Sequence, residues 1–175
     1  ITLTETPTYD KELITNYAIG SINNTTYNFQ YTYDADKNIK KEYGSFINNF
    51  YTYDNNNQLI RVIDSINNRT TVFKYDIRGN LVKETVYGKN DYADNGNNAV
   101  PLDEIVYTYG NSDWQDQLTK VNSKEITYDG AGNRTSYDGW NYNWEGGRQL
   151  ASMSKGDTTI TYKYDDSGVR TEKKV

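Results

Sequence analysis

A short cluster of the form aromatic–x–aromatic–Asp recurs along this chain of 175 residues, at intervals close to twenty residues. Clear copies occupy residues 31–34, 51–54, 73–76 and 162–165, and altered copies occupy 107–110, 126–129 and 142–145. Self-similarity at a fixed period is typical of arrays in which neighbouring units bury one another's faces. The sequence therefore predicts a tandem-repeat protein in which a single unit does not fold alone.

Each repeat has the pattern of a β-hairpin. The two rings of a Tyr-x-Tyr strand lie on one face, because successive strand side chains point to opposite faces. The Asp that follows can accept hydrogen bonds from backbone N–H groups of the turn, and a Gly three residues later supplies a positive φ. In two repeats this glycine is replaced, by Lys37 in one and by Asn57 in the other. Aliphatic and Thr-rich stretches, such as 59–63 and 81–86, then predict the return strand of a hairpin of about twenty residues.

The residues expected to build the repeats are the second aromatic, the Asp and the turn Gly. They are Tyr33, Asp34, Tyr53, Asp54, Tyr75, Asp76, Gly79, Tyr128, Asp129, Gly132, Tyr164, Asp165 and Gly168. We expect the tyrosines to be largely buried on one face, where they form a structural ladder between successive hairpins. The residue between each pair of aromatics is expected on the other face.

A Tyr-Asp pair followed by Gly-Asn and an aliphatic residue, as in Tyr75-Asp76 with Gly79-Asn80-Leu81, resembles the consensus of the Rhs/YD-repeat family. The resemblance covers roughly residues 31–175. It implies an all-β fold of tandem YD-repeat hairpins that form a curved, spiralling antiparallel sheet. It also implies a secreted or cell-surface bacterial protein, whose repeats serve as a scaffold or as a shell around a C-terminal effector. The partners would then be neighbouring repeats and the C-terminal domain of the same full-length protein.

The chain departs from this family pattern in its prolines and at its N-terminal end. Pro7 and Pro101 are the only prolines, and neither follows an Asp, so the family's Asp-Pro-x-Gly-type self-cleavage motif cannot be carried over. Residues 1–30 match poorly and are interpreted as an eroded N-terminal repeat or lead-in segment. Residues 31–175 form the predicted array, interrupted by a polar loop insertion at 88–101. As a segment of a longer array, the chain is expected to expose sheet edges and to self-associate weakly through them.

Composition narrows the range of functions. Histidine and cysteine are absent, which excludes Ser-His-Asp and Cys-His catalysis and metal sites built from His or Cys. The repeat acids each have an adequate role as turn formers, so neither an enzyme nor a cofactor is predicted. Residues 91–102 resemble a calcium loop in part, but Ala93 and Leu102 stand where oxygen ligands are required. A net charge of −5 argues against a nucleic-acid partner.

The aromatic residues leave two functions open. The 18 tyrosines and 3 tryptophans supply the apolar area that few aliphatic residues provide. A structural ladder is the preferred interpretation of the tyrosines. The alternative is an adhesion or carbohydrate-binding module that contacts a cell-surface glycan. Trp114, Trp140 and Trp144 are the candidate ligand contacts, because they fall outside the Tyr ladder or replace a member of it.

Overall fold

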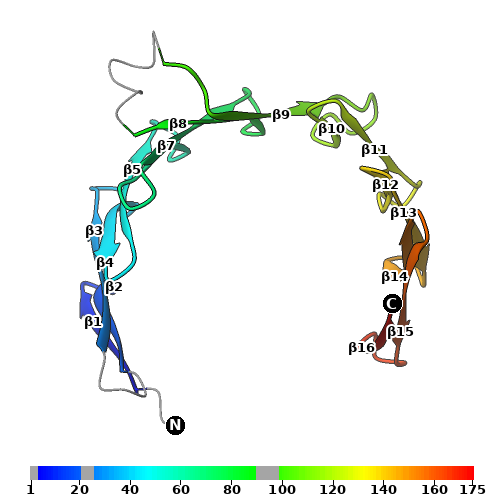
Figure 1. Ribbon diagram of the computed structural model, residues 1–175, viewed down its shortest axis with the longest axis horizontal. Helices are drawn as coiled ribbons and strands as arrows, with labels where there is room; N and C mark the ends of the chain where they lie inside the picture. The colour runs from blue at the N-terminus through cyan, green and yellow to red at the C-terminus, as the bar shows by residue number, and fades with distance from the viewer. Residues whose placement is uncertain (1–3, 21–25, 90–98) are drawn as a thin grey trace. The chain divides into compact units, whose positions relative to one another are not determined.

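The computed structural model describes residues 4–20, 26–89 and 99–175, and these residues form an all-β structure. Most of the predicted loop insertion, residues 90–98, lies outside the described part, and so do residues 1–3 and 21–25. In the described part sixteen antiparallel strands follow one another, and their order in the sheet is their order along the chain (Figure 1). The predicted all-β array of antiparallel hairpins is therefore confirmed. Within these residues no helix is long and apolar enough to cross a membrane.

The chain divides into two compact units, Ile1–Ile105 and Val106–Val175. The first unit holds β1 to β8 and the start of β9, and the second holds the rest of β9 and β10 to β16. The strands are β1 (Thr4–Asp10), β2 (Leu13–Gly20), β3 (Thr26–Tyr33), β4 (Ile39–Gly44), β5 (Asn48–Tyr53), β6 (Leu59–Asp64), β7 (Arg69–Tyr75), β8 (Leu81–Gly88), β9 (Asp103–Tyr109), β10 (Leu118–Val121), β11 (Lys124–Tyr128), β12 (Arg134–Tyr137), β13 (Trp140–Glu145), β14 (Gln149–Lys155), β15 (Thr158–Tyr164) and β16 (Arg170–Lys174).

A β-bulge recurs at the same place in the hairpins. Between β3 and β4 the register passes from Thr32 opposite Lys41 to Tyr33 opposite Ile39, so that Lys40 is an extra residue. Every other described hairpin that pairs an odd-numbered strand with the next even-numbered one shows the same shift. The extra residue places the second aromatic and the first residue of the return strand on one face. The bulge therefore belongs to the repeat, although the sequence pattern did not predict it.

The N-terminal segment keeps the bulge but loses the Asp turn. In β1 and β2 the register passes from Thr8 opposite Asn16 to Tyr9 opposite Ile14. The turn between them consists of Lys11 and Glu12, with φ values of 46° and 74°. Positive φ at both central residues is the signature of a type I′ hairpin turn, which normally favours Asn and Gly. This hairpin is built differently from those that carry the Asp turn.

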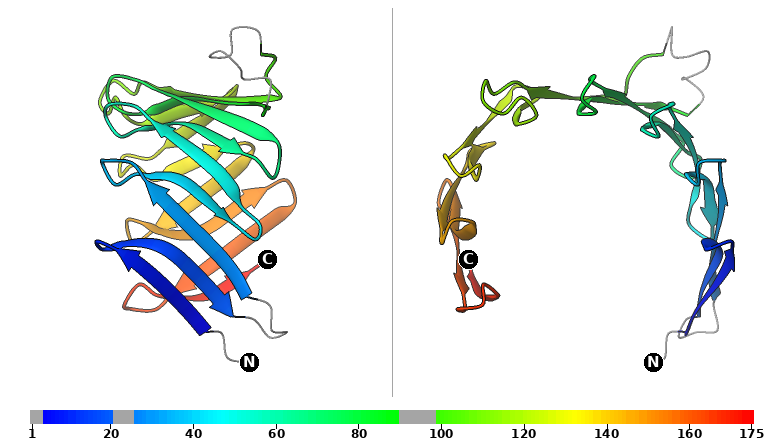
Figure 2. Two further views of the ribbon diagram at one scale, coloured as in Figure 1. Left: turned by 90° about the vertical axis from the view of Figure 1, so that its left-hand side faces the viewer. Right: turned by 180° about the vertical axis from the view of Figure 1, so that it is seen from behind.

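The turns of each unit gather along its two edges, because consecutive strands alternate in direction. The connections from odd-numbered to even-numbered strands lie along one edge, and those from even-numbered to odd-numbered strands lie along the other. Figure 2 shows this arrangement for the first unit, where the blue to cyan strands run side by side between two rows of turns. The repeat turns of a unit are therefore neighbours in space.

Each unit, taken by itself, is a single layer of strands, and burial is correspondingly shallow. Among the described residues Ile126, at 8% exposure, is the only buried apolar side chain. The ladder tyrosines are intermediate in exposure, so that most of each side chain is covered although none is fully buried. Neighbouring strands cover the sides of each ring, but no second layer within the unit covers its face. The tyrosines Tyr33, Tyr53, Tyr75, Tyr128 and Tyr164 all share this half-buried state.

The expected alternation between the two faces holds with one difference. Residues between the paired aromatics, such as Thr32, Lys74 and Thr127, are exposed. Thr52 is half-buried, and the guanidinium of Arg61 donates a hydrogen bond to its hydroxyl at 3.3 Å. The long Arg61 side chain, opposite Thr52 in the register, accounts for the lower exposure.

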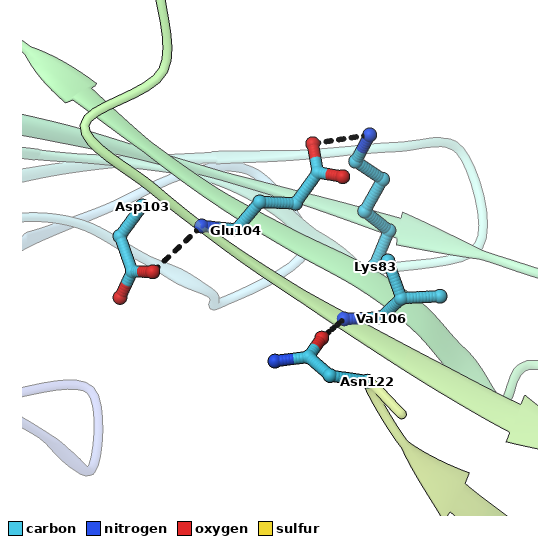
Figure 3. Close-up of polar contacts among 5 residues, drawn as sticks. All are labelled: Lys83, Asp103, Glu104, Val106 and Asn122. Atoms are coloured by element: carbon cyan, nitrogen blue, oxygen red, sulfur yellow. Dashed lines mark hydrogen bonds and ion pairs between the residues drawn. The ribbon is translucent and has the colours of Figure 1, made fainter. Parts of the chain in front are cut away.

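Two groups of contacts hold the segment around β9 in place, one in each unit (Figure 3). In the first unit Glu104 forms an ion pair with Lys83 of β8, and Asp103 Oδ1 accepts a hydrogen bond from Glu104 N at 2.8 Å. In the second unit Val106 N donates to Asn122 Oδ1 at 2.8 Å, and Asn122 N donates to Val106 O at 2.7 Å. Each unit therefore secures its own part of this strand.

Candidate functional site

The repeat turns are held by their Asp carboxylates. Asp34 Oδ1 accepts hydrogen bonds from the backbone N–H groups of Asp36 and Asn38, both at 2.9 Å. Asp34 Oδ2 accepts another bond from the Asn38 side-chain amide at 3.1 Å. The same pair of backbone bonds to Oδ1 recurs at Asp54, Asp76, Asp129 and Asp165. These carboxylates are occupied inside their own turns, where a bound substrate would have to compete for them.

The fourth residue of every Asp turn has a positive φ. The angle is 87° at Gly79, 81° at Gly132 and 81° at Gly168, as the sequence predicted. It is 69° at Lys37 and 60° at Asn57, which fill the same slot in the two repeats without glycine. Only glycine enters this region without a steric cost, and lysine pays more than asparagine. The Asp hydrogen bonds evidently hold the turn even with a lysine in the strained position.

Hydrogen bonding also fixes the charge of the turn carboxylates. The Asn80 amide holds the pKa of Asp76 below its ordinary value, and the Asn133 amide does the same for Asp129. For Asp165 the main cause of the lowered pKa is the hydrogen bond from the Ser167 hydroxyl. These groups are therefore ionised at neutral pH, which suits an acceptor of N–H groups and does not suit a general acid.

A ladder of hydrogen bonds joins neighbouring repeats within each unit. Tyr53 donates its hydroxyl to the carbonyl of Ile39 at 3.0 Å, and Tyr75 donates to that of Leu59 at 2.8 Å. The acceptor is each time the return-strand residue that pairs with the second aromatic of the preceding repeat. The same contact joins Tyr33 to Ile14 at 2.7 Å, Tyr128 to Leu118 at 2.8 Å and Tyr164 to Leu150 at 3.2 Å. The ring positions followed from the sequence, but the carbonyl acceptors lie about one repeat away and were not predicted.

Tyr51 belongs to a polar cluster on the ladder face. Its hydroxyl donates to Glu42 Oε2 at 2.7 Å and accepts a hydrogen bond from the Asn49 amide at 3.2 Å. Burial raises the pKa of Tyr51 to about 12, and the Glu42 carboxylate acts in the same direction. Burial also raises the pKa of Tyr31, which faces Glu42 across the β3/β4 pair. Both phenols therefore stay neutral at any physiological pH.

The three tryptophans occupy three different environments and do not form a common site. Trp144 takes the ladder position of β13, and its indole Nε1 donates to Arg134 O at 2.7 Å. Trp140 begins β13 opposite Tyr137 and is half-buried beside the turn at 138–139. Trp114 is 55% exposed and lies in the connection between β9 and β10, along the other edge of the unit. Of the three, only Trp114 presents a largely open ring.

Trp114 forms one wall of a hollow of about 340 Å³ in the second unit. Ile126, buried to 8% exposure, and Gln117, buried to 7%, also line this hollow. The Asp129 turn closes its opposite side through Gly130 and Gly132. Sequence reasoning singled out Trp114, but nothing in the pattern pointed to Gln117. Within the described residues no group of three or more Asp or Glu side chains could hold a metal ion.

Residues 53–89 match the model of the RHS Repeat family. These residues carry an RHS repeat. Among curated proteins, 62 residues are 45% identical to the tRNA nuclease WapA of Bacillus subtilis strain 168 and, equally, to the tRNA3(Ser)-specific nuclease WapA of Bacillus spizizenii. That stretch is 34% of this chain and 3% of each relative, so the chain spans only a small part of the proteins that it matches.

Two solved structures share the fold over 98% of this chain. One is the Tc holotoxin pore of Photorhabdus luminescens with the mutation TccC3-D651A, with a TM-score of 0.72 and 17% identity. The other is the TcdB2-TccC3 complex, with a TM-score of 0.67 and 17% identity. The match covers 10% of each of those chains. At this level of identity the likeness shows the fold, and it agrees with the antiparallel RHS-repeat hairpins described above.

Proposed function

We propose that this array of RHS repeats is a non-enzymatic wall, one stretch of a shell that encloses a C-terminal effector of the same longer protein. The observation that carries the proposal is the way the polar groups of the repeat are used. The Asp carboxylates bind their own turns, and the ladder hydroxyls bind the neighbouring repeat. Polar groups that make these hydrogen bonds stabilise the sheet, and few of them are left to bind a substrate or react with it.

The relatives support a place within a larger toxin-like protein. The array matches only small parts of chains named as nucleases or as components of a Tc toxin. Nuclease activity is not transferred to these repeats, since a wall and an enclosed enzyme would occupy different parts of one chain. We infer that the longer protein is secreted or displayed at a bacterial surface.

The proposal is tested by protease protection of the longer protein. In the intact protein, the region C-terminal to the repeats should resist a broad-specificity protease. The double variant Asp76→Ala and Asp129→Ala opens one turn in each unit, and it should expose that region to cleavage. Asp36→Ala is the matched control, because its carboxylate is exposed and the turn uses only its backbone N–H. Equal protection in all three proteins would refute the role as a wall.

A further inference from the structure

Two repeats of the second unit carry an arginine at a position where the other repeats carry an aliphatic residue. This position pairs with the second aromatic of each hairpin. Its aliphatic occupants are Ile14, Ile39, Leu59, Leu81, Leu118 and Leu150. Arg134 occupies it opposite Tyr128, and Arg170 occupies it opposite Tyr164. Both arginines therefore lie on the ladder face, among the aromatic rings.

These arginines contact aromatic rings and no carboxylate. The guanidinium of Arg134 lies 4.4 Å from the centroid of the Tyr142 ring and 5.6 Å from that of the Tyr137 ring. The guanidinium of Arg170 lies 5.5 Å from the centroid of the Tyr162 ring. Neither arginine forms an ion pair with a described residue. A guanidinium held over an aromatic ring can still bind a carboxylate through the N–H groups of its edge.

The ladder face of β12 to β16 has cations but no carboxylate in its strands. Residues 134–174, which the structure describes throughout, contain two glutamates within these five strands. Glu145 pairs with Gln149 and Glu172 pairs with Lys163, and both glutamates belong to the opposite face because they alternate with the ladder aromatics. Lys173 lies on the ladder face opposite Tyr162, and its exposed ammonium has no ion-pair partner among the described residues. This face therefore attracts a negatively charged partner.

The unpaired cations stand at the two ends of an apolar strip. Arg134 lies on β12, whereas Arg170 and Lys173 lie on β16, four strand spacings away. At 4.7–4.9 Å per spacing the two ends are about 19 Å apart. Leu150 and Met153 of β14 lie midway, opposite the Trp144 and Tyr142 rings of β13, and they are half-buried without a second layer of the unit above them. An extended peptide rises about 3.3 Å per residue, so about six residues span the strip.

The first unit shows that a cationic strip is not a general result of the repeat. Its ladder face carries Glu42 opposite Tyr31 and Glu84 opposite Phe73. The Glu42 carboxylate already accepts the Tyr51 hydroxyl at 2.7 Å. The same hairpin architecture therefore presents carboxylates on one unit and unpaired arginines on the other.

From this arrangement we propose that the ladder face of β12 to β16 binds an extended acidic peptide. One carboxylate of the peptide pairs with Arg134, and another, about six residues along, pairs with Arg170 and Lys173. Apolar side chains of the peptide lie between them on the aromatic strip. A nucleic acid fits this face less well, because turn carboxylates such as Asp157 and Asp165 flank it at both edges and repel a continuous phosphate backbone. The site does not depend on the role of the array as a wall.

The test is fluorescence anisotropy of a labelled peptide, acetyl-Glu-Thr-Leu-Thr-Phe-Thr-Glu-amide, titrated with the intact chain. Both of its Glu side chains lie on one side of an extended peptide, together with Leu and Phe. We expect a Kd on the order of 0.1 mM, since a short flexible peptide loses conformational freedom on binding. Added salt should weaken the binding, and a peptide with Gln in place of both Glu should bind at least about tenfold more weakly.

Two variants of the chain locate the site. Arg134→Gln and Lys173→Gln should each weaken binding of the acidic peptide about fivefold, because each removes one charge-assisted contact. Lys174→Gln is the matched control. It removes the same charge from the neighbouring residue, which pairs with Thr161 on the opposite face, and it should bind the peptide as the wild type does.

Four results would overturn the proposal. They are no binding of the acidic peptide, equal affinity for its Glu and Gln forms, an equal loss of affinity in Lys174→Gln and Lys173→Gln, and tighter binding of a short oligothymidylate than of the peptide. Circular dichroism and the melting temperature establish that each variant is folded. Should Arg134→Gln unfold, Lys173→Gln alters only an exposed side chain and must then reduce the affinity, or the strip is not the site.

Discussion

Replacing Tyr75 by phenylalanine removes one ladder hydrogen bond and nothing else of the ring. The lost contact is the 2.8 Å bond from the Tyr75 hydroxyl to the backbone carbonyl of Leu59, and both residues are half-buried in adjacent repeats. A hydrogen bond of this kind contributes a net of about 0.5–1.5 kcal/mol, so we expect the free energy of unfolding to fall by about 1 kcal/mol. For a chain of this size that corresponds to a melting temperature lower by about 2–4 °C.

The measurement is urea unfolding followed by circular dichroism, with thermal unfolding as a second readout. Tyr43→Phe is the matched control, because the Tyr43 hydroxyl makes no hydrogen bond in the described structure while its ring contacts the Lys41 ammonium at 4.2 Å. Tyr164→Phe, whose bond is longer at 3.2 Å, should cost less than Tyr75→Phe. If Tyr75→Phe unfolds at the same urea concentration as Tyr43→Phe, the ladder bonds do not stabilise the array.

Further predictions concern the turns, the pH dependence of stability and the sheet edges. Gly132→Val should destabilise the chain by about 1–3 kcal/mol in urea unfolding, because a β-branched residue must adopt positive φ; Gly130→Ala, with open space around its Cα, should have little effect. The pKa of Asp129 is lowered from 3.8, so the ionised carboxylate contributes its full stability above pH 3.8, and this contribution is lost as the pH falls through the lower pKa of the folded state. Asp129→Asn should therefore reduce the loss of stability at acid pH in a stability–pH profile. Tyr51 has its pKa raised from 10.0 to about 12, so its contribution is complete below pH 10 and is lost as pH rises through 12; an alkaline limb unchanged in Tyr51→Phe would contradict this. Finally, β16 has one neighbour in the strand order, and sedimentation of the isolated chain should show weak, concentration-dependent association that a strictly monomeric chain at high concentration would disprove.

The local parts of the fold could be predicted from the sequence, because the period and the turn chemistry act within a few residues. Asp76 with Gly79 and Asn80 specifies a tight turn, and Tyr-x-Tyr specifies a face. The acceptor of each ladder hydroxyl could not be predicted, since Leu59 reaches Tyr75 only after two hairpins have paired. A period-two pattern predicts which face a ring lies on, but it carries no information about how many layers cover that ring, so the exposure left to each tyrosine could not be predicted from it.

The residues that line the hollow beside Trp114 could be predicted only in part from the sequence. Trp114 stood out because it lies outside the Tyr ladder. Gln117 lies in the same connection as Trp114, and nothing in the sequence indicates that it is buried beside the Asp129 turn. Trp144 was grouped with Trp114 as a ligand contact, but its indole donates to Arg134 O at the ladder position. The two environments differ in register, which only the paired strands reveal.

The ladder bonds all run in one direction along the chain, with the donor in the later repeat and the acceptor in the earlier one. A ribosome or a secretion channel that delivers the chain from its N-terminus presents each new hairpin to a surface that is already complete. No described ladder contact waits for residues that have not yet emerged. If delivery of the chain pauses, the ladder carbonyl of the last folded repeat is hydrated. The aromatic side chain of that repeat is already hydrogen-bonded to the repeat before it. Each ladder contact can therefore form as soon as the later of its two repeats has emerged, with the earlier repeat as its template.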